Sequence, residues 1–367
     1  MTAHLRLVAA WATVAAMQFL IDPTDYVGTG SLMTVFLFVW LLGVIFWSAF
    51  GVVHEAEEVA ERLGEPLGTL VLTLSIVIIE VALISAVMLS AKDVPTLGRD
   101  TMFAVLMIVL NGVVGICLLV GGLRFHQQTY NLQGASAYLA VIIPLAVIAL
   151  VLPNFTTSTS VGTLSLMQAG FFSLFTIGLY ASFLWLQTGR HQGFFLPIAG
   201  KKDEEAGVAI PHHAPAPGST GFRILILVAN ILPIVLLAKS LAVLLDFGIE
   251  ALGAPAALGG IIIAMIVFTP EGISALKAVA ANQLTRAINL CLGAAASTLG
   301  LTVPAVLLIG LLTDQPVVLG LSGANMVLLA VTLILNTLTF SSGRTTMLEG
   351  TVHLSLFFVF LVLVFSP

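Results

Sequence analysis

The chain has 367 residues, of which 59% are hydrophobic and only 8% are charged, and its mean hydropathy is +1.12. A water-soluble protein would need about 25% charged residues to cover its surface, so this composition excludes that class. The net charge of −5 and the lack of a basic cluster exclude a nucleic-acid-binding protein. We therefore expect an all-α polytopic membrane protein.

Eleven apolar runs are long enough to cross about 30 Å of hydrocarbon as helices. No small-residue cleavage site follows the first run, so we interpret it as a retained helix. The predicted transmembrane helices are residues 5–22, 31–53, 67–90, 101–123, 137–153, 165–187, 221–246, 256–277, 289–312, 317–340 and 349–366.

The basic residues of the connecting segments are distributed unequally between the two sides of the membrane. Ten of the 13 lie on the N-terminal side and two, Lys92 and Arg99, lie on the other, while Lys239 lies inside a predicted span. The positive-inside rule therefore predicts a cytoplasmic N-terminus and an outside C-terminus. The regular alternation also supports the count of eleven spans.

A polar, proline-containing segment at residues 188–220 interrupts the apolar pattern. It is too polar to bury, and we interpret it as a cytoplasmic linker. The chain then divides into an extra N-terminal helix (1–30), a first five-helix repeat (31–187), the linker and a second five-helix repeat (221–367).

Two acidic residues lie deep inside predicted spans, Glu80 in the third and Glu271 in the eighth. An ionised side chain at the centre of a membrane helix costs about 2.5–3.5 kcal/mol, so such residues are functional candidates. Gly68 precedes Glu80 by 12 residues, and Gly259 precedes Glu271 by the same 12. Because the third and eighth spans enter from opposite sides, we predict two inverted repeats with a site at their interface.

Other oxygen-bearing side chains accompany the two acids on the same or adjoining spans. Pro270, directly before Glu271, predicts a break that frees backbone carbonyls in that helix. Two carboxylates balance one divalent cation or bind two protons, and competition between these occupants is sufficient for antiport. The predicted cation and proton ligands are Glu80, Glu271, Thr73, Ser75, Asn111, Ser297 and Thr298, with the two glutamates as the metal ligands.

The stretches 64–81, 268–277 and 299–304, which contain both acids, resemble bacterial ChaA-type calcium:proton antiporters of the calcium/cation antiporter superfamily. The resemblance covers essentially the whole chain. It implies export of Ca²⁺, or of Na⁺ or K⁺, driven by proton entry across a bacterial inner membrane, with no cofactor. Gly293-Ala294-Ala295 stands where the wider family has Gly-Ser-Ser, and Ile78-Ile79 where it has Gly-Asn, which leaves the cation preference open.

Two further groups allow alternative interpretations. His54, Glu58, Glu61 and Glu65 share a helical face, which is either a cytoplasmic cation-sensing surface or an ordinary solvated one. Lys239 is either a counter-ion for the buried glutamates or a snorkelling residue at the interface.

A rival hypothesis from another class is an intramembrane serine protease that uses Ser322 and His353. It leaves both central glutamates unexplained, so we favour a transporter over an enzyme. The expected partners are inorganic cations, protons and the lipid bilayer, and nucleic acid is not expected. The sequence does not decide whether the protein forms a homo-oligomer.

Overall fold

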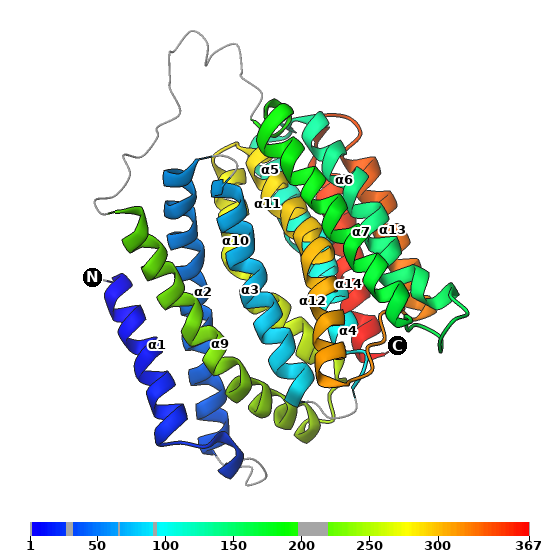
Figure 1. Ribbon diagram of the computed structural model, residues 1–367. Coiled ribbons are helices and arrows are strands. Elements are labelled where there is room, and N and C mark those ends of the chain that lie inside the picture. Colours follow the sequence, from blue (N-terminus) through cyan, green and yellow to red (C-terminus); the bar gives the residue numbers. More distant parts are fainter. Residues whose placement is uncertain (1, 27–31, 65–66, 91–93, 197–218, 367) are drawn as a thin grey trace.

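The computed structural model describes residues 2–26, 32–64, 67–90, 94–196 and 219–366 of the chain. These residues form a bundle of long helices that lie roughly side by side (Figure 1). The helical elements before residue 197 are α1 (Thr2–Phe19), η1 (Pro23–Asp25), α2 (Leu32–Leu63), α3 (Leu67–Ser90), α4 (Leu97–Met107), η2 (Ile108–Val113), α5 (Val114–Phe125), α6 (Leu132–Ala146), η3 (Val147–Val151), η4 (Leu152–Phe155), α7 (Leu166–Trp185), η5 (Leu186–Arg190) and η6 (Gln192–Phe195).

The described part of the chain after residue 218 continues in the same way. Its helical elements are α9 (Thr220–Ala251), α10 (Ala257–Ala280), α11 (Leu284–Ser297), η7 (Thr298–Thr302), α12 (Val303–Thr313), α13 (Gly323–Thr339) and α14 (Met347–Phe365). A short antiparallel ribbon of β1 (Gln128–Thr129) and β2 (Arg344–Thr345) ties the α5–α6 connection to the α13–α14 connection.

Each predicted span corresponds to one helical unit, and nine units in the described chain are long and apolar enough to cross a membrane. This confirms an all-α polytopic membrane protein. α1 is not among the nine, and α13 has 17 residues, so their crossing of the bilayer stays a prediction. α2 extends ten residues past the predicted end at residue 53, because the acidic segment that follows continues the helix.

The helix break expected at Pro270 was wrong. α10 runs unbroken from Ala257 to Ala280 with Pro270 inside it. A proline removes one backbone donor, and that loss did not separate this helix into two pieces.

Irregular helix appears instead in the neighbouring units. η2, inside Leu97–Phe125, and η7, inside Leu284–Thr313, are both π-helical turns. Such turns are rare and often occur at functional sites. They lie in the unit that follows Glu80 and the unit that follows Glu271, so each acid has an irregular helix next in the chain.

One end of the bundle collects the basic residues and is called the basic end below. There α2, α5 and η5 end and α9 and α11 begin, each with an arginine in its terminal turn (Figure 1). These arginines are Arg62, Arg124, Arg190, Arg223 and Arg286. The distribution agrees with the alternation read from the sequence.

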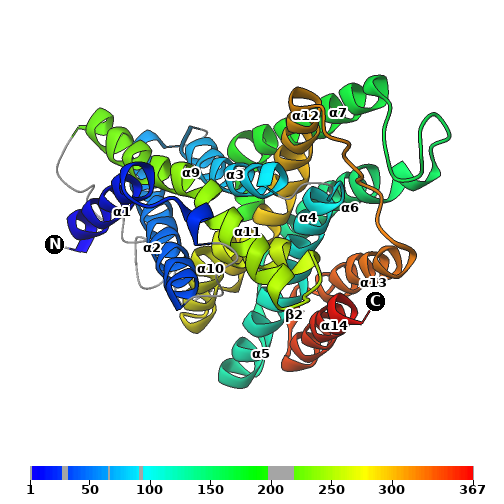
Figure 2. The same ribbon diagram turned by 90° about the horizontal axis from the view of Figure 1, so that it is seen from below.

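α1 lies at the rim of the bundle, against α2 and α9 (Figure 2). Arg6 is buried in this contact and donates a hydrogen bond from Nε to Asn230 Oδ1 at 3.3 Å. The Arg6 guanidinium occupies the space where a side chain at Gly51 would stand, so the glycine makes this approach of α1 to α2 sterically available.

Candidate cation site

Glu80 is 1% exposed on α3, and the second half of the chain supplies its hydrogen-bond donors. Thr298 Oγ1 and Thr302 Oγ1 donate to Glu80 Oε2 at 3.1 and 2.9 Å. The two threonines begin and end η7, four residues apart, which places them on one face. Glu80 Oε1 is buried without a hydrogen-bond partner among the described residues, so one oxygen stays open to a ligand.

Glu271, on α10, has a different environment. Its Oε2 is also buried without a partner in the described chain. Val109 and Val113, from the helix that contains η2, line the narrow space beside it together with Cys291. The charge of Glu80 acts on Glu271, so the two carboxylates lie within electrostatic range of one another.

A cavity of about 200 Å³ connects Glu271 with the basic end. Thr69 in the first turn of α3 and Arg286 in the first turn of α11 line its outer part. Glu271 and Ser297 line its inner part. A hydrated cation that enters from the basic end would therefore pass an arginine before it reaches the carboxylate.

Two buried tyrosines form a wall of this cavity that the sequence analysis did not anticipate. Tyr180, on α7, interacts with Thr73 and lies within range of the Glu271 charge. Its Cβ packs against Gly300 in η7, where any side chain would collide with the ring. Tyr138 Oη accepts a hydrogen bond from Gln187 Nε2 at 2.7 Å. Tyrosine hydroxyls thus supply neutral oxygens in the cavity that Gly293 and Ala294 also line.

The neutral ligands predicted from sequence separate into two groups. Thr298 contacts Glu80, and Thr73 and Ser297 line the cavity. Ser75 instead donates from Oγ to the Val71 carbonyl at 2.6 Å within its own helix. Thr302 was missed as a hydrogen-bond donor to Glu80, although it follows Thr298 by one helical turn and that spacing could have identified it.

Asn111 lines neither space beside Glu271 and is hydrogen-bonded to α13 and α14 instead. Its Nδ2 donates to Thr332 Oγ1 at 2.8 Å, and its Oδ1 lies 3.1 Å from His353 Nδ1. The second ring nitrogen of His353 lies 3.0 Å from Thr339 Oγ1. Asn111 therefore belongs to a fully buried polar network that joins η2 to α13 and α14.

The same network removes the structural basis of the protease hypothesis. Both nitrogens of His353 are occupied, and the side chain is 0% exposed. Ser322 caps α13, where its Oγ accepts from Asn325 N at 3.4 Å. Ser322 directly precedes α13, whereas His353 contacts Thr339, the last residue of that helix. The two residues therefore lie at opposite ends of α13, about 25 Å apart.

The acidic face of α2 is already partly neutralised. Glu58 lies 2.8 Å from Arg223 and 3.3 Å from His54, and Glu55 also pairs with Arg223. Glu61 is exposed, and Glu65 lies outside the described residues. Cation sensing at this face stays a prediction, and its central carboxylate already has an arginine as counter-ion.

Lys239 is exposed and lines a separate cavity with Asp22, whose charge it attracts. It is therefore placed to balance Asp22 rather than the buried glutamates. Within the described residues, no three His, Cys, Asp or Glu side chains converge on a metal position. A cation held by Glu80 and Glu271 must complete its shell with hydroxyl, carbonyl or water oxygens.

Comparisons with known proteins identify the family. The sequence model of the sodium/calcium exchanger protein family matches residues 33–189 and 222–366. The chain is 38% identical over 327 residues to the sodium-potassium/proton antiporter ChaA of Escherichia coli K12, covering 89% of this chain and 87% of that protein. It is 40% identical over 335 residues to the ionic transporter y4hA of Sinorhizobium fredii, covering 91% and 90%.

Solved structures agree with the fold. YfkE superimposes with a TM-score of 0.69 at 17% identity, covering 99% of this chain and 100% of that one. The H⁺/Ca²⁺ exchanger CAX gives a TM-score of 0.67 at 13% identity, covering 99% and 89%. The chain belongs to the sodium/calcium exchanger family and is an integral membrane antiporter of cations, not an enzyme.

Proposed function

We propose that this protein exports Ca²⁺ from the cytoplasm in exchange for protons, and that Glu80 and Glu271 bind the cation and the protons by turns. The observation that carries the proposal is a buried carboxylate, Glu80, within electrostatic range of a half-buried one, Glu271, each with one buried oxygen free of hydrogen bonds in the described chain. A divalent cation between the free oxygens neutralises both charges, and two protons do the same. Each occupant therefore excludes the other.

The arrangement of the two halves supports alternating access. Each acid is followed in the chain by a unit with a π-helical turn, and the donors to Glu80 come from the unit that follows Glu271. Such reciprocal pairing is what an inverted repeat produces at its interface. In the described conformation the cavity extends from Glu271 to the basic end, which is the cytoplasmic end by the positive-inside rule. This is the state that would load a cytoplasmic cation.

Alkali cations are the second candidate cargo. The relative that is 38% identical is named a sodium-potassium/proton antiporter, whereas a Ca²⁺/H⁺ antiporter of Aphanothece halophytica is 25% identical over 261 residues, covering 67% of this chain and 68% of that protein. Ca²⁺ takes six to eight oxygens at about 2.3–2.6 Å. Alanines at 294 and 295 lower the number of hydroxyls, while Thr302 and Tyr180 add to it.

A flux assay tests the proposal. The purified protein is reconstituted in liposomes, a pH gradient is imposed, and uptake of Ca²⁺, Na⁺ and K⁺ is measured in parallel samples. We expect Ca²⁺ uptake that follows the gradient and stops with a protonophore. If only Na⁺ or K⁺ is taken up, Ca²⁺ is not the cargo but the exchange mechanism stands. If the gradient drives uptake of none of the three cations, the proposal is rejected.

The stoichiometry follows from a second measurement in the same liposomes. Exchange of one Ca²⁺ for two protons is electroneutral, so a membrane potential leaves its rate unchanged. A third proton would move one net charge, which is worth about 2.3 kcal/mol per 100 mV.

A further inference from the structure

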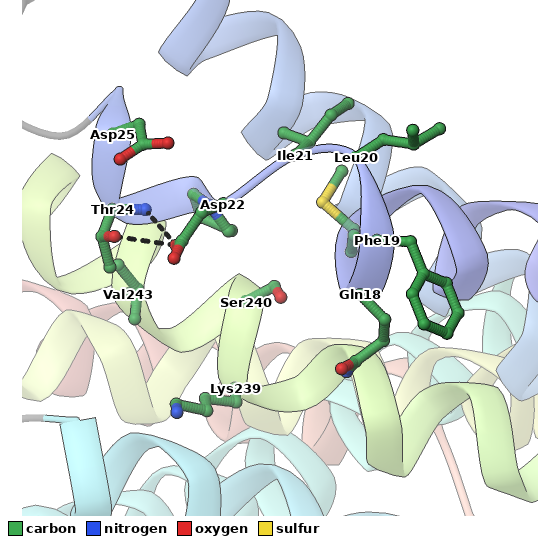
Figure 3. Close-up of a pocket in the computed structure, with 12 residues that line it drawn as sticks. Gln18, Phe19, Leu20, Ile21, Asp22, Thr24, Asp25, Lys239, Ser240 and Val243 are labelled. Carbon is green, nitrogen blue, oxygen red and sulfur yellow. Dashed lines mark hydrogen bonds between the residues drawn. The ribbon is translucent and has the colours of Figure 1, made fainter.

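A second cavity, of about 490 Å³, lies far from the buried glutamates, where the end of α1 and η1 face one turn of α9 (Figure 3). Asp22, Asp25 and Lys239 are its charged residues, and Gln18 and Ser240 add neutral polar groups. Figure 3 shows Asp22, Ser240, Gln18 and Lys239 around a common open space, with Asp25 on the outer side of η1. The transport mechanism uses none of them.

The charged groups are available to a ligand. Asp22 Oδ1 accepts from Thr24 N and Thr24 Oγ1 at 2.9 and 2.8 Å, and these bonds lower the pKa of the Asp22 carboxyl, which is therefore ionised at neutral pH. In the part of the chain that the structure describes, the side chains of Asp25 and Lys239 make no hydrogen bond or ion pair. Lys239 attracts Asp22 at longer range, so a cationic and an anionic pole face the same space.

The cavity opens on the lipid-facing rim of the bundle. α1 is peripheral (Figure 2), and Phe19 and Leu20 beside the cavity are 84% and 82% exposed. Large apolar side chains this exposed at the end of a membrane helix face acyl chains. A ligand that lies here therefore borders the bilayer, and a lipid meets that condition directly.

The positions of the charges match one class of lipid. Lys239 lies within α9, twelve residues before its end, whereas Asp22 and Asp25 lie beyond the end of α1. The lysine therefore lines the cavity from the inner part of α9, whereas the carboxylates line it from the segment that follows α1. A zwitterionic phospholipid has the same order, with its phosphate next to the glycerol and its amine further out. One lysine and two aspartates leave a net negative cavity, which disfavours an anionic headgroup.

We propose that this cavity binds the headgroup of a phosphatidylethanolamine in the leaflet where α1 ends, with Lys239 on the phosphate and Asp22 and Asp25 on the ammonium. A primary ammonium donates three hydrogen bonds, which a carboxylate accepts, whereas the trimethylated amine of choline donates none. The carboxylates therefore select ethanolamine, and the lysine contributes to binding of any phospholipid. α1 with η1 thus has a role as the wall of a lipid site.

Native mass spectrometry of the full chain tests this proposal. The protein in detergent is incubated with equal amounts of phosphatidylethanolamine, phosphatidylcholine and phosphatidylglycerol that have identical acyl chains. It is then released from the detergent in the spectrometer, and the lipids that stay bound are counted. We expect ethanolamine lipid to exceed choline lipid by about threefold to tenfold, the range for charge-assisted hydrogen bonds in a partly exposed site. Equal binding of the two, or a preference for phosphatidylglycerol, would overturn the proposal.

Two variants and a control separate the charges. Asp22→Asn with Asp25→Asn should bring the ethanolamine-to-choline ratio close to one, while Lys239→Gln should lower the binding of both lipids. Glu250→Gln removes an exposed carboxylate at the same end of α9 that does not line the cavity, and it should leave the ratio unchanged. Size-exclusion profiles establish that each variant is folded, and an unchanged ratio in a folded double variant also contradicts the assignment. The readout needs no transport, so it is independent of the proposed exchange activity.

Discussion

The two buried acids differ in what surrounds them. Glu80 receives hydrogen bonds from two threonines four residues apart, Thr298 and Thr302. Beside Glu271, two valines that are also four residues apart, Val109 and Val113, line the same narrow space. The hydroxyls hold the Glu80 carboxylate in one orientation, whereas the valines give Glu271 no donor. The two acids thus have unequal surroundings, with one carboxylate held by two donors and the other next to the cavity.

The largest effect is expected from removal of either charge. Glu80→Gln and Glu271→Gln each keep a side chain of similar size but cannot balance a divalent cation or exchange a proton. We expect proton-driven Ca²⁺ uptake into inverted vesicles to fall to background in both variants, with normal membrane insertion. Retained transport in both would remove these residues from the mechanism. A loss in only one would show that the asymmetry extends to function.

Removal of the threonine hydroxyls tests the asymmetry itself. Thr298→Val with Thr302→Val leaves the carboxylate of Glu80 without donors, and each bond to a charged group contributes about 1.5–3 kcal/mol. We expect the KM for the cation to rise about tenfold or more, measured as initial uptake against cation concentration.

The reverse change provides the matched comparison. Val113→Thr adds a hydroxyl beside Glu271, and we expect transport to persist with an altered ratio of Ca²⁺ to Na⁺ uptake. An unchanged KM in the valine double variant would mean that the threonines have only a structural role.

The sequence predicted the helices well because a bilayer fixes the length of an apolar run, as α3 shows by its agreement with the predicted 67–90. It also identified both acids, since ionised groups are costly in that setting. The hydrogen-bond partners of those acids were harder to predict from the sequence. Thr302 and Glu80 are 222 residues apart and meet only through packing, and the π-helical turns have no sequence signature that we used.

Asn111 and Pro270 show which features one sequence does not determine. Asn111 was assigned to the cation because it lies on the adjoining span, but the direction of its side chain depends on α13 and α14. Pro270 was expected to break α10, but α10 runs continuously through it, as membrane helices do where neighbouring groups satisfy the freed carbonyl. Both outcomes depend on tertiary contacts that one sequence does not display.

A smaller effect is expected at Tyr180. Tyr180→Phe removes one neutral oxygen from the cavity wall and keeps the ring that packs on Gly300. We expect the KM for the cation to rise about threefold, a typical loss for one neutral hydrogen bond, with unchanged thermal stability. Tyr130→Phe is the control, because Tyr130 is equally buried but lies in the loop at the basic end. Equal effects of both variants would assign a packing role to the hydroxyl.

The smallest effect is expected at Ser322, a residue of the second half that lies outside the site. Ser322→Ala removes the N-cap of α13, which costs about 1 kcal/mol of stability, and the measurable change is a slightly lower unfolding temperature. Cation uptake should be unchanged, because the cap contacts neither acid and the cavity does not include it. A loss of uptake in a folded Ser322→Ala protein would mean that the transport machinery extends along α13. The comparison of the two acids would then have to include α13, whose Thr332 is a partner of Asn111.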